Sequence, residues 1–416
     1  MFNSFRLSMV MILYISLLIG CNINPPQQGT EKPERREENV SQPKIPTEKE
    51  EDPILKQIET MTLDQKIGQM VLVGFEGTVV NDHIRELIDD YNIGGVIFYK
   101  QNISGTDQAI ILLNSVKEIN SDNTIPLFLS VDEEGGRVTR MPNEFTRLPT
   151  NEEIGRINNE DFSQRIGQIL GKELKAFGFN MDYAPVLDIN NNPNNPVIGD
   201  RSFGPIPELV SKLAISTMKG IGSQHVIPVV KHFPGHGDTS VDSHKELPVV
   251  NKSMEELQSF ELIPFKEALE NGAEVVMIAH ILLPQIDTKY PASMSKSVIT
   301  DLLRGSMKFD GVVITDDMTM GAILKNYDIS EAAVQSVSAG SDIILVAHDF
   351  DTEVQVIQAL KKSVEDGRIP EKMIDQSVYR ILKLKKKYAL TNETIKNVDV
   401  KSINLEISRL LEEYTQ

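Results

Sequence analysis

The sequence lacks several residues and motifs that mark common protein classes. Its 416 residues include no tryptophan and a single cysteine, and 42 Lys and Arg residues face 60 Asp and Glu residues. One cysteine excludes an intramolecular disulfide framework. The net charge of −18 argues against the broad basic face that nucleic-acid binding requires. No glycine fingerprint of the G-x-G-x-x-G or P-loop kind occurs, which argues against a nucleotide-binding protein.

The N-terminus has the pattern of an export signal. Residues 1–21 read MFNSFRLSMVMILYISLLIGC, with one Arg followed by an apolar run that is too short for a transmembrane helix. Gly20 before Cys21 resembles a bacterial lipoprotein signal, in which Cys21 is lipidated and becomes the mature N-terminus. We therefore expect a lipid-anchored protein on the extracytoplasmic face of the cell membrane. An ordinary signal peptide or a membrane anchor, with an incidental cysteine, stays open as the alternative.

Composition divides the rest of the chain into three parts. Residues 22–52 are rich in Pro, Gln, Glu and Lys and contain little to bury, which predicts a flexible polar linker. Residues 53–390 have a globular composition and form one predicted folded domain. Residues 391–416 are polar and then weakly amphipathic, which predicts a terminal helix packed on the body or a frayed end.

Short apolar runs alternate with helical patterns along the globular part. Near-continuous apolar runs are typical of strands buried on both faces in a parallel sheet. Eight such strands with intervening helices predict a (β/α)8 barrel. The runs are MVLVGF (70–75), GGVIFY (94–99), PLFLSVD (126–132), MDYAPVLDI (181–189), VIPVVKH (226–232), EVVMIAH (274–280), GVVITDD (311–317) and DIILVAH (342–348).

Titratable side chains recur where these runs end. In a barrel the carboxyl ends of the strands meet at one face, where active sites are built. A doubly wound sheet would also bind ligands at these ends, so the expected position of the site does not depend on which fold is right. The residues concerned are Asp132, Asp188, His232, His280, Asp316 and His348.

Five motifs carry a resemblance to a known enzyme family. They are VDEEGGRVTR (131–140), DYAPVLDINNNPNNPVIGDRSFG (182–204), KHFPGHGDTSVDSH (231–244), VMIAHI (276–281) and GVVITDDMTMGAI (311–323). Together they resemble glycoside hydrolase family three, in particular its β-N-acetylglucosaminidase branch. The third motif is the most specific of the five.

The resemblance implies catalytic roles for three residues. Asp316 matches the nucleophile, which forms a glycosyl-enzyme and so retains the anomeric configuration. His244 matches the acid/base, and Asp242 matches the carboxylate that orients it. A histidine suits this work because an imidazole ordinarily exchanges its proton near pH 6.5. Asp317 is interpreted as structural.

Four further residues match contacts to the sugar hydroxyls: Asp132, Arg201, Lys231 and His232. A carboxylate that accepts from hydroxyls beside a guanidinium that donates can fix a pyranose against the nucleophile. Other polar residues nearby are given supporting roles. We interpret Glu134 and Arg140 as salt-bridge partners and His236 and Asp238 as residues that support their loop, and we expect Gly235 and Gly237 to make that loop mobile.

The predicted function is that of an exo-acting, retaining β-N-acetylglucosaminidase that removes terminal GlcNAc from peptidoglycan fragments. No metal or organic cofactor and no nucleic-acid partner is implied, and we expect a monomer. Phosphorylase or transglycosylase activity at the same site stays open, as does a non-catalytic, wall-binding lipoprotein. A zinc hydrolase is a further alternative, with ligands drawn from His232, His236, Asp238, Asp242 and His244.

Overall fold

The computed structural model describes residues 52–414. The predicted signal, the lipid attachment at Cys21 and nearly all of the predicted linker lie outside the described residues. Within the part of the chain that is described, no helix combines the length and the apolar character needed to cross a membrane.

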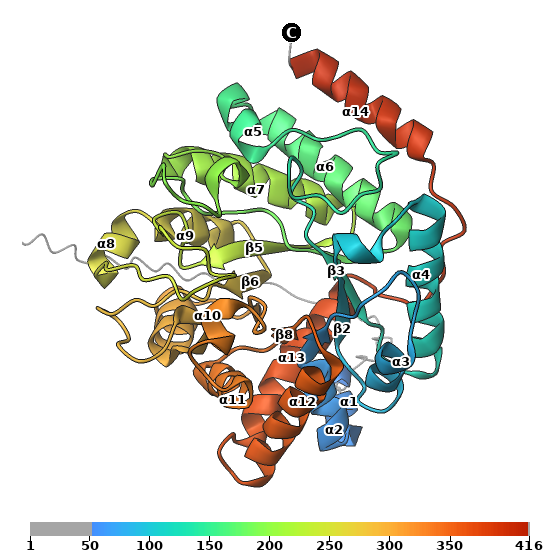
Figure 1. The fold of residues 1–416 in the computed structure, drawn as a ribbon, viewed down its shortest axis with the longest axis vertical. Helices are drawn as coiled ribbons and strands as arrows, with labels where there is room; N and C mark the ends of the chain where they lie inside the picture. Colours follow the sequence, from blue (N-terminus) through green and yellow to red (C-terminus); the bar gives the residue numbers. More distant parts are fainter. Residues whose placement is uncertain (1–51, 415–416) are drawn as a thin grey trace, which may run out of the picture. The chain divides into compact units, whose positions relative to one another are not determined.

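Eight parallel strands form the centre of the fold, in the order β7-β6-β5-β4-β3-β2-β1-β8. A parallel bridge between Ile314 and Ile343 joins the two outer strands and closes the barrel. The predicted (β/α)8 barrel is thus confirmed, and Figure 1 shows the helices around the central strands. The strands are β1 (Val71–Val73), β2 (Gly95–Phe98), β3 (Phe128–Val131), β4 (Met181–Asp182), β5 (Ile227–Phe233), β6 (Val275–Ile278), β7 (Val312–Thr315) and β8 (Ile344–Val346).

Each predicted apolar run coincides with one strand, although β5 extends one residue beyond its run to Phe233, and every strand residue is buried. The run 181–189 is the exception in length, because β4 covers only its first two residues. Pro185 has no N–H to donate to a ladder, and beyond Asp182 only one bridge, from Val186 to Lys231, continues the pairing with β5. This short strand leaves Asp188 in a buried loop beside β5.

Helices cover the outside of the barrel. They are α1 (Pro53–Thr60), α2 (Leu63–Gln69), α3 (Asp82–Asp89), α4 (Thr106–Ile119), α5 (Asn151–Ile157), α6 (Glu160–Phe177), α7 (Pro207–Ser223), α8 (Met254–Ser259), α9 (Leu262–Glu270), the π-helix η5 (Ser297–Ser306), α10 (Gly321–Leu324), α11 (Ile329–Ala339), α12 (Phe350–Glu365), α13 (Glu371–Lys387) and α14 (Val400–Tyr414). Four 3₁₀ turns join them: η1 (Lys100–Asn102), η2 (Asn120–Asp122), η3 (Gly199–Arg201) and η4 (Ala292–Met294). Helices α6 and α7 pack so closely that a Cβ on Gly167 would lie 2.2 Å from the Thr217 carbonyl oxygen.

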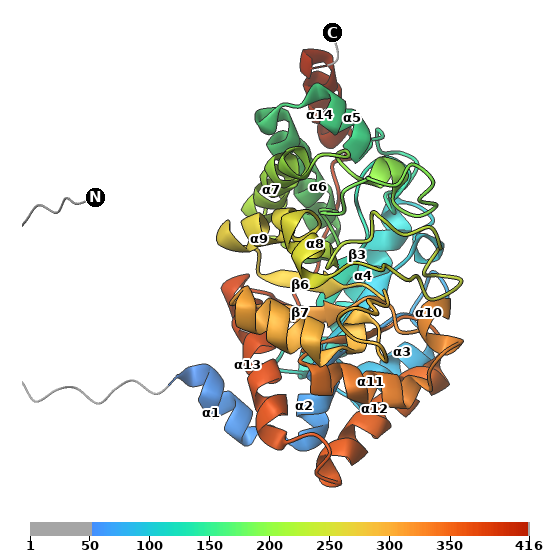
Figure 2. The same cartoon turned by 90° about the vertical axis from the view of Figure 1, so that its left-hand side faces the viewer.

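Helix α13 closes the end of the barrel at which the strands begin. Its Lys385 is buried and donates to the carbonyl of Gly94 and to the side chain of Gln69, both at 2.8 Å. Burial lowers the pKa of Lys385 well below its usual value. Helix α1 packs against α13, and the side chain of Asp52 accepts a hydrogen bond from Tyr379 at 2.8 Å (Figure 2). The described chain therefore enters the fold at this closed end.

The last helix, α14, lies against α6 on the outer surface, as both views show (Figures 1 and 2). Its buried residues Ile403, Ile407 and Leu410 recur at the spacing of one helix face. Arg165 on α6 pairs with Glu413 at 2.9 Å. This apolar face and its ion pair hold the C-terminal segment on the barrel.

A buried carboxyl group near the open end of the barrel makes stability depend on pH. Glu353, in the first turn of α12, is buried and accepts a hydrogen bond from the N–H of Gly74 at 3.1 Å. Burial, with the nearby carboxylates of Asp349 and Asp317, raises the pKa of Glu353 to about 8. The folded protein therefore holds this proton at pH values where the unfolded chain has lost it.

We predict that Glu353→Gln flattens this pH dependence. Because the folded-state pKa is raised, the wild-type free energy of unfolding falls as pH rises from the usual value of 4.5 to about 8. Glutamine resembles the protonated acid, so the variant should match the wild type at pH 5 and exceed it by on the order of 3 kcal/mol at pH 8. Denaturant unfolding at both pH values measures this, with the exposed Glu365→Gln on the same helix as control. An unchanged pH dependence in Glu353→Gln would contradict the assignment.

Candidate active site

One cavity of about 360 Å³ opens where the strands end. All seven residues predicted to act on the sugar line it: Asp132, Arg201, Lys231, His232, Asp242, His244 and Asp316. They come from the ends of β3, β5 and β7 and from the loops that follow β4 and β5. Residues that are up to 184 positions apart in the sequence are thus brought to one place by the convergence of the strands.

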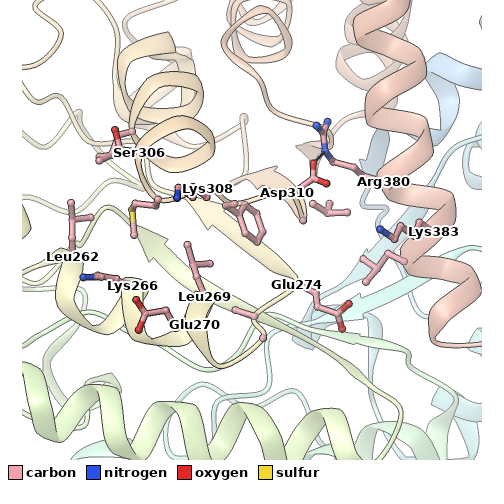
Figure 3. Close-up of a pocket in the computed structure, with 18 of the residues that line it drawn as sticks. Leu262, Lys266, Leu269, Glu270, Glu274, Ser306, Lys308, Asp310, Arg380 and Lys383 are labelled. Carbon is pink, nitrogen blue, oxygen red and sulfur yellow. Dashed lines mark hydrogen bonds and ion pairs between the residues drawn. The ribbon is translucent and has the colours of Figure 1, made fainter. Parts of the chain in front are cut away.

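A larger hollow of about 1090 Å³ lies at the other end of the barrel, between α9, η5 and α13 (Figure 3). Its wall includes Leu262, Leu269 and Phe309. Four of its charges form two ion pairs, Arg380 with Asp310 at 3.2 Å and Lys387 with Glu274 at 2.8 Å. No histidine lines it. None of the residues predicted to act on the sugar reaches this hollow.

A buried carboxylate organises the charges of the predicted sugar-binding residues. Glu134 accepts from Arg201 through two bonds, of 2.9 and 2.7 Å, and its Oε1 lies 2.7 Å from Nζ of Lys231. Lys231 also donates to Asp132 at 2.7 Å. Burial alone would raise the pKa of Glu134, but the charges of Arg201 and Lys231 hold that pKa far below its usual value. Glu134 is thus a salt-bridge partner that fixes two predicted sugar ligands.

Asp316 follows β7 directly and lies at the base of the cavity. Its N–H donates to the Ile278 carbonyl at 3.0 Å, and its own carboxylate accepts from the N–H of Asp317 at 2.9 Å. Burial would raise the pKa of Asp316, but the charges of His232 and His280 and the N–H of Asp317 hold the pKa below its usual value. The carboxylate is therefore ionised at neutral pH, as a nucleophile must be.

Asp317 and His280 support this lower part of the cavity. Asp317 accepts from the N–H and the hydroxyl of Thr319, at 2.9 and 2.8 Å, and from the N–H of Ala347 at 3.1 Å. His280 is fully buried, with one ring nitrogen 2.7 Å from Ser293 Oγ and the other 3.0 Å from the Asp317 carbonyl oxygen. Both side chains are occupied by structural hydrogen bonds.

The loop after β5 contains the predicted acid/base pair. Nδ1 of His244 lies 2.9 Å from Oδ1 of Asp242, and the His244 N–H donates to the same oxygen at 3.0 Å. The His244 side chain is 66% exposed. A ring that donates through Nδ1 to a carboxylate leaves Nε2 free to exchange a proton with a substrate oxygen.

The sequence predicted that Gly235 and Gly237 make this loop mobile, but the structure gives them a packing role. Both are buried; Gly235 has φ of 130°, and a Cβ on Gly237 would lie 1.7 Å from the carbonyl oxygen of Ile189. Glycine is required because the loop passes directly over the segment that follows β4. Asp238, the other predicted supporting residue, pairs with Lys252 at 2.8 Å.

Sequence reasoning missed the position of Arg140. It was predicted only as a salt-bridge partner, and its Nη2 does lie 3.5 Å from Asp132. Arg140 also lines the cavity, and among residues 52–414 its buried Nε has no hydrogen-bond partner. Gly135 and Gly136, both with positive φ, turn the chain after β3 so that Arg140 returns beside Asp132. The glycine pair was the available signal, but it does not indicate where the returning side chain points.

Two aromatic rings form another part of the cavity wall. Tyr99 and His348 stack with ring centroids 5.1 Å apart, and both line the cavity. His348 was noted in the sequence as a titratable residue at the end of an apolar run, whereas Tyr99, just after β2, was not singled out. Within the described residues, no three His, Cys, Asp or Glu side chains are grouped so that they could hold a metal ion. The histidines of β5 and of the loop that follows it contact Asp188, Ser243 and Asp242.

Comparison with known proteins assigns the chain to a family. Residues 62–384 match the family described as Glycosyl hydrolase family 3 N terminal domain. A β-hexosaminidase of Nitrosomonas eutropha is 31% identical over 81% of this chain and 99% of its own, and one of Neisseria meningitidis serogroup C is 36% identical over 73% and 82%. The solved structure of a family 3 β-N-acetylglucosaminidase from Paenibacillus sp. superposes with a TM-score of 0.81 at 42% identity, covering 85% of this chain and 69% of that one.

The named relatives, together with the carboxylates that line the cavity at the strand ends, show that the protein is a glycosidase. The chain belongs to glycosyl hydrolase family 3.

We predict that Glu134→Gln weakens folding, because it leaves Lys231 and Arg201 buried with too little negative charge. Breaking a buried ion network typically costs about 3–5 kcal/mol, measured here as the loss of unfolding free energy in urea. Glu152→Gln is the matched control, since Glu152 forms an exposed pair with Arg156 at 2.8 Å. That control should change stability by less than about 0.5 kcal/mol. Equal effects of the two substitutions would contradict the role assigned to Glu134.

Proposed function

We propose that the protein is an exo-acting, retaining β-N-acetylglucosaminidase that uses Asp316 as nucleophile and the Asp242–His244 pair as acid/base. One observation carries the proposal: an ionised carboxylate and an Asp-oriented histidine line the same small cavity. The names of the family relatives, β-hexosaminidase and β-N-acetylglucosaminidase, support the choice of sugar. The cavity volume is near the lower end of the ~300–1,000 Å³ typical of small-molecule sites, which favours one terminal sugar over the middle of a chain.

The first step forms a covalent intermediate. An oxygen of Asp316 attacks the anomeric carbon while the glycosidic C–O bond breaks, and His244 gives the proton on Nε2 to the departing oxygen. The carboxylate of Asp242 stabilises the positive charge that the ring carries before this transfer. Asp316 is then bound to the sugar as an ester, and His244 is neutral.

The second step releases the sugar. Neutral His244 takes a proton from a water molecule, whose oxygen attacks the anomeric carbon from the side that the leaving group vacated. The bond to Asp316 breaks and its carboxylate is restored. Two inversions at one carbon give net retention.

The remaining polar residues of the cavity would hold the sugar. Asp132 is held by Lys231 and Arg140, so its orientation is fixed before substrate arrives. Burial would raise the pKa of Asp132, but the charges of Lys231 and Arg140 lower it, so the side chain is an ionised acceptor for sugar hydroxyls. His232, Arg201 and the unpaired Nε of Arg140 supply donors.

The natural substrate and the location are part of the proposal. We infer that the enzyme removes terminal GlcNAc from peptidoglycan fragments, and that Cys21 anchors it by lipid to the outer face of the cell membrane. The lipoprotein-like signal before Cys21 supports this location, because an enzyme anchored there meets cell-wall material.

We predict that residues 53–416 release nitrophenol from p-nitrophenyl β-N-acetylglucosaminide in the presence of EDTA, and that Asp316→Asn lowers kcat by more than about 10³-fold. The loss is expected because the other carboxylates that line the cavity are held by protein groups: Asp132 by Lys231, Asp242 by His244, and Asp317 by Thr319 and Ala347. The assay is repeated with increasing phosphate. Asp310→Asn, at an exposed position before β7, is the control and should retain full activity.

Each of three results would change the assignment. Substantial activity in Asp316→Asn would remove it as nucleophile. Loss of activity on chelation would favour the zinc hydrolase. A rate that rises with phosphate, together with a sugar-phosphate product, would identify a phosphorylase.

We predict that the effect of His244→Ala depends on the leaving group. Good leaving groups depart without protonation, so kcat/KM should change little for a dinitrophenyl glycoside and fall by about 10²–10⁴-fold for a sugar aglycone. The slow second step of the variant should be accelerated by azide, which attacks without a base. Equal losses with both substrates and no effect of azide would contradict the acid/base role.

A further inference from the structure

The residue between the two members of the acid/base pair is much more deeply buried than His244. Ser243 lies between Asp242 and His244 and is 2% exposed, whereas the His244 side chain is 66% exposed. The Ser243 hydroxyl lies 3.1 Å from Nε2 of His236. His236 is 1% exposed and belongs to the same loop, seven residues earlier.

We propose that His236 is a positioning residue of the reaction: through its contact with Ser243 it sets the place of His244 over the substrate. This inference rests on the proposed acid/base role of His244. It assigns to His236 a task beyond general support of its loop, because the contact is made to the residue that separates the two members of the pair.

The backbone of His236 is fixed at both of its polar groups. Its N–H donates to Oδ1 of Asp188 at 2.6 Å, and its carbonyl oxygen accepts from Nδ2 of Asn195 at 2.8 Å. The second oxygen of Asp188 lies 2.6 Å from Nδ1 of His232, a predicted sugar ligand. Asp188 therefore ties the sugar-binding residue and the positioning histidine to one buried point.

The protonation of the ring suits a fixed contact. Burial and the neighbouring charge of His232 lower the pKa of His236 to about 4, so the ring is neutral near pH 7. The Thr239 hydroxyl donates to the His236 carbonyl at 3.0 Å, which leaves it to accept from the ring nitrogen Nδ1 at 2.8 Å. With its one proton on Nδ1, the ring accepts a hydrogen bond from the Ser243 hydroxyl at Nε2.

The same serine is also held from the nucleophile's side of the cavity. The N–H of Ala322 donates to the Ser243 carbonyl and the N–H of Gly321 donates to the His244 carbonyl, both at 3.1 Å. These glycine and alanine residues begin α10, five positions beyond Asp316. Ser243 is thus fixed between the β5 loop and the β7 loop, which sets the acid/base at a defined distance from the nucleophile.

Two substitutions at His236 separate the two ring contacts. Asparagine places a polar atom near the position of Nδ1 and keeps the contact with Thr239, whereas glutamine places one near Nε2 and keeps the contact with Ser243. We expect His236→Asn to lower kcat/KM for a sugar aglycone by about tenfold, a part of the 10²–10⁴-fold that acid catalysis contributes. The same variant should stay within about threefold of wild type on a dinitrophenyl glycoside, since that leaving group needs no proton.

One rescue variant and two serine variants complete the test. His236→Gln should recover most of the loss on the sugar aglycone. Ser243→Ala should reproduce the His236→Asn pattern, and Ser240→Ala, an exposed serine of the same loop, should behave as wild type. Melting temperatures are measured for all four variants, and Ser243→Ala serves as the test if His236→Asn does not fold.

The outcomes distinguish this inference from the function on which it rests. If His244→Ala shows no dependence on the leaving group, the acid/base assignment fails and the positioning role fails with it. If His244→Ala shows that dependence but His236→Asn and Ser243→Ala lose rate equally on both substrates, or lose none, only the positioning role is overturned. An equal loss in His236→Gln and His236→Asn would likewise overturn it.

Discussion

The ion pairs of the Glu134 carboxylate, which is buried between the cations of Arg201 and Lys231, are the interaction on which the predicted sugar-binding half of the site depends. These three residues come from the loops after β3 and β4 and from β5 itself. Two cations at the floor of a cavity would repel each other and would resist burial without a shared counter-ion. With Glu134 in place they can stay charged, and Lys231 in turn orients Asp132. Charge balance, more than apolar packing, therefore shapes this part of the cavity.

Much of the fold could be predicted because a strand that is buried on both faces appears in the sequence as a short continuous apolar run, such as VVMI in β6. The predicted sugar-facing residues were found through motifs, and all of them line one cavity. The packing role of the glycines was not predicted, because composition cannot reveal that Gly237 lies against Ile189, 48 positions away. Asp188 was noted only as the end of a run. Its contacts with His232 and His236 depend on the path of a loop, which no local pattern encodes.

The two halves of the proposed catalytic machinery are supported in different ways. Asp316 follows a barrel strand and is fixed by backbone hydrogen bonds to β6 and to its own turn. Asp242 and His244 lie on a loop, and their support comes from side chains and from the start of α10. A nucleophile needs one fixed position below the sugar, whereas an acid/base must reach an oxygen whose aglycone varies. Asn195, in the asparagine-rich segment after β4, supports this loop by donating to the carbonyls of His236 and Gly237.

The chain enters the barrel at the end that α13 closes, and the cavity opens at the other end. Asp52 contacts Tyr379 on α13, while Asp316 and His244 lie beyond the strand termini. Anything joined to the protein ahead of residue 52, whether a lipid, a resin or a fused partner, is therefore attached at the back of the barrel. Substrates and released sugars can pass through the open end without crossing that point of attachment. The direction of the strands thus places the cavity and the point of attachment at opposite ends of the barrel.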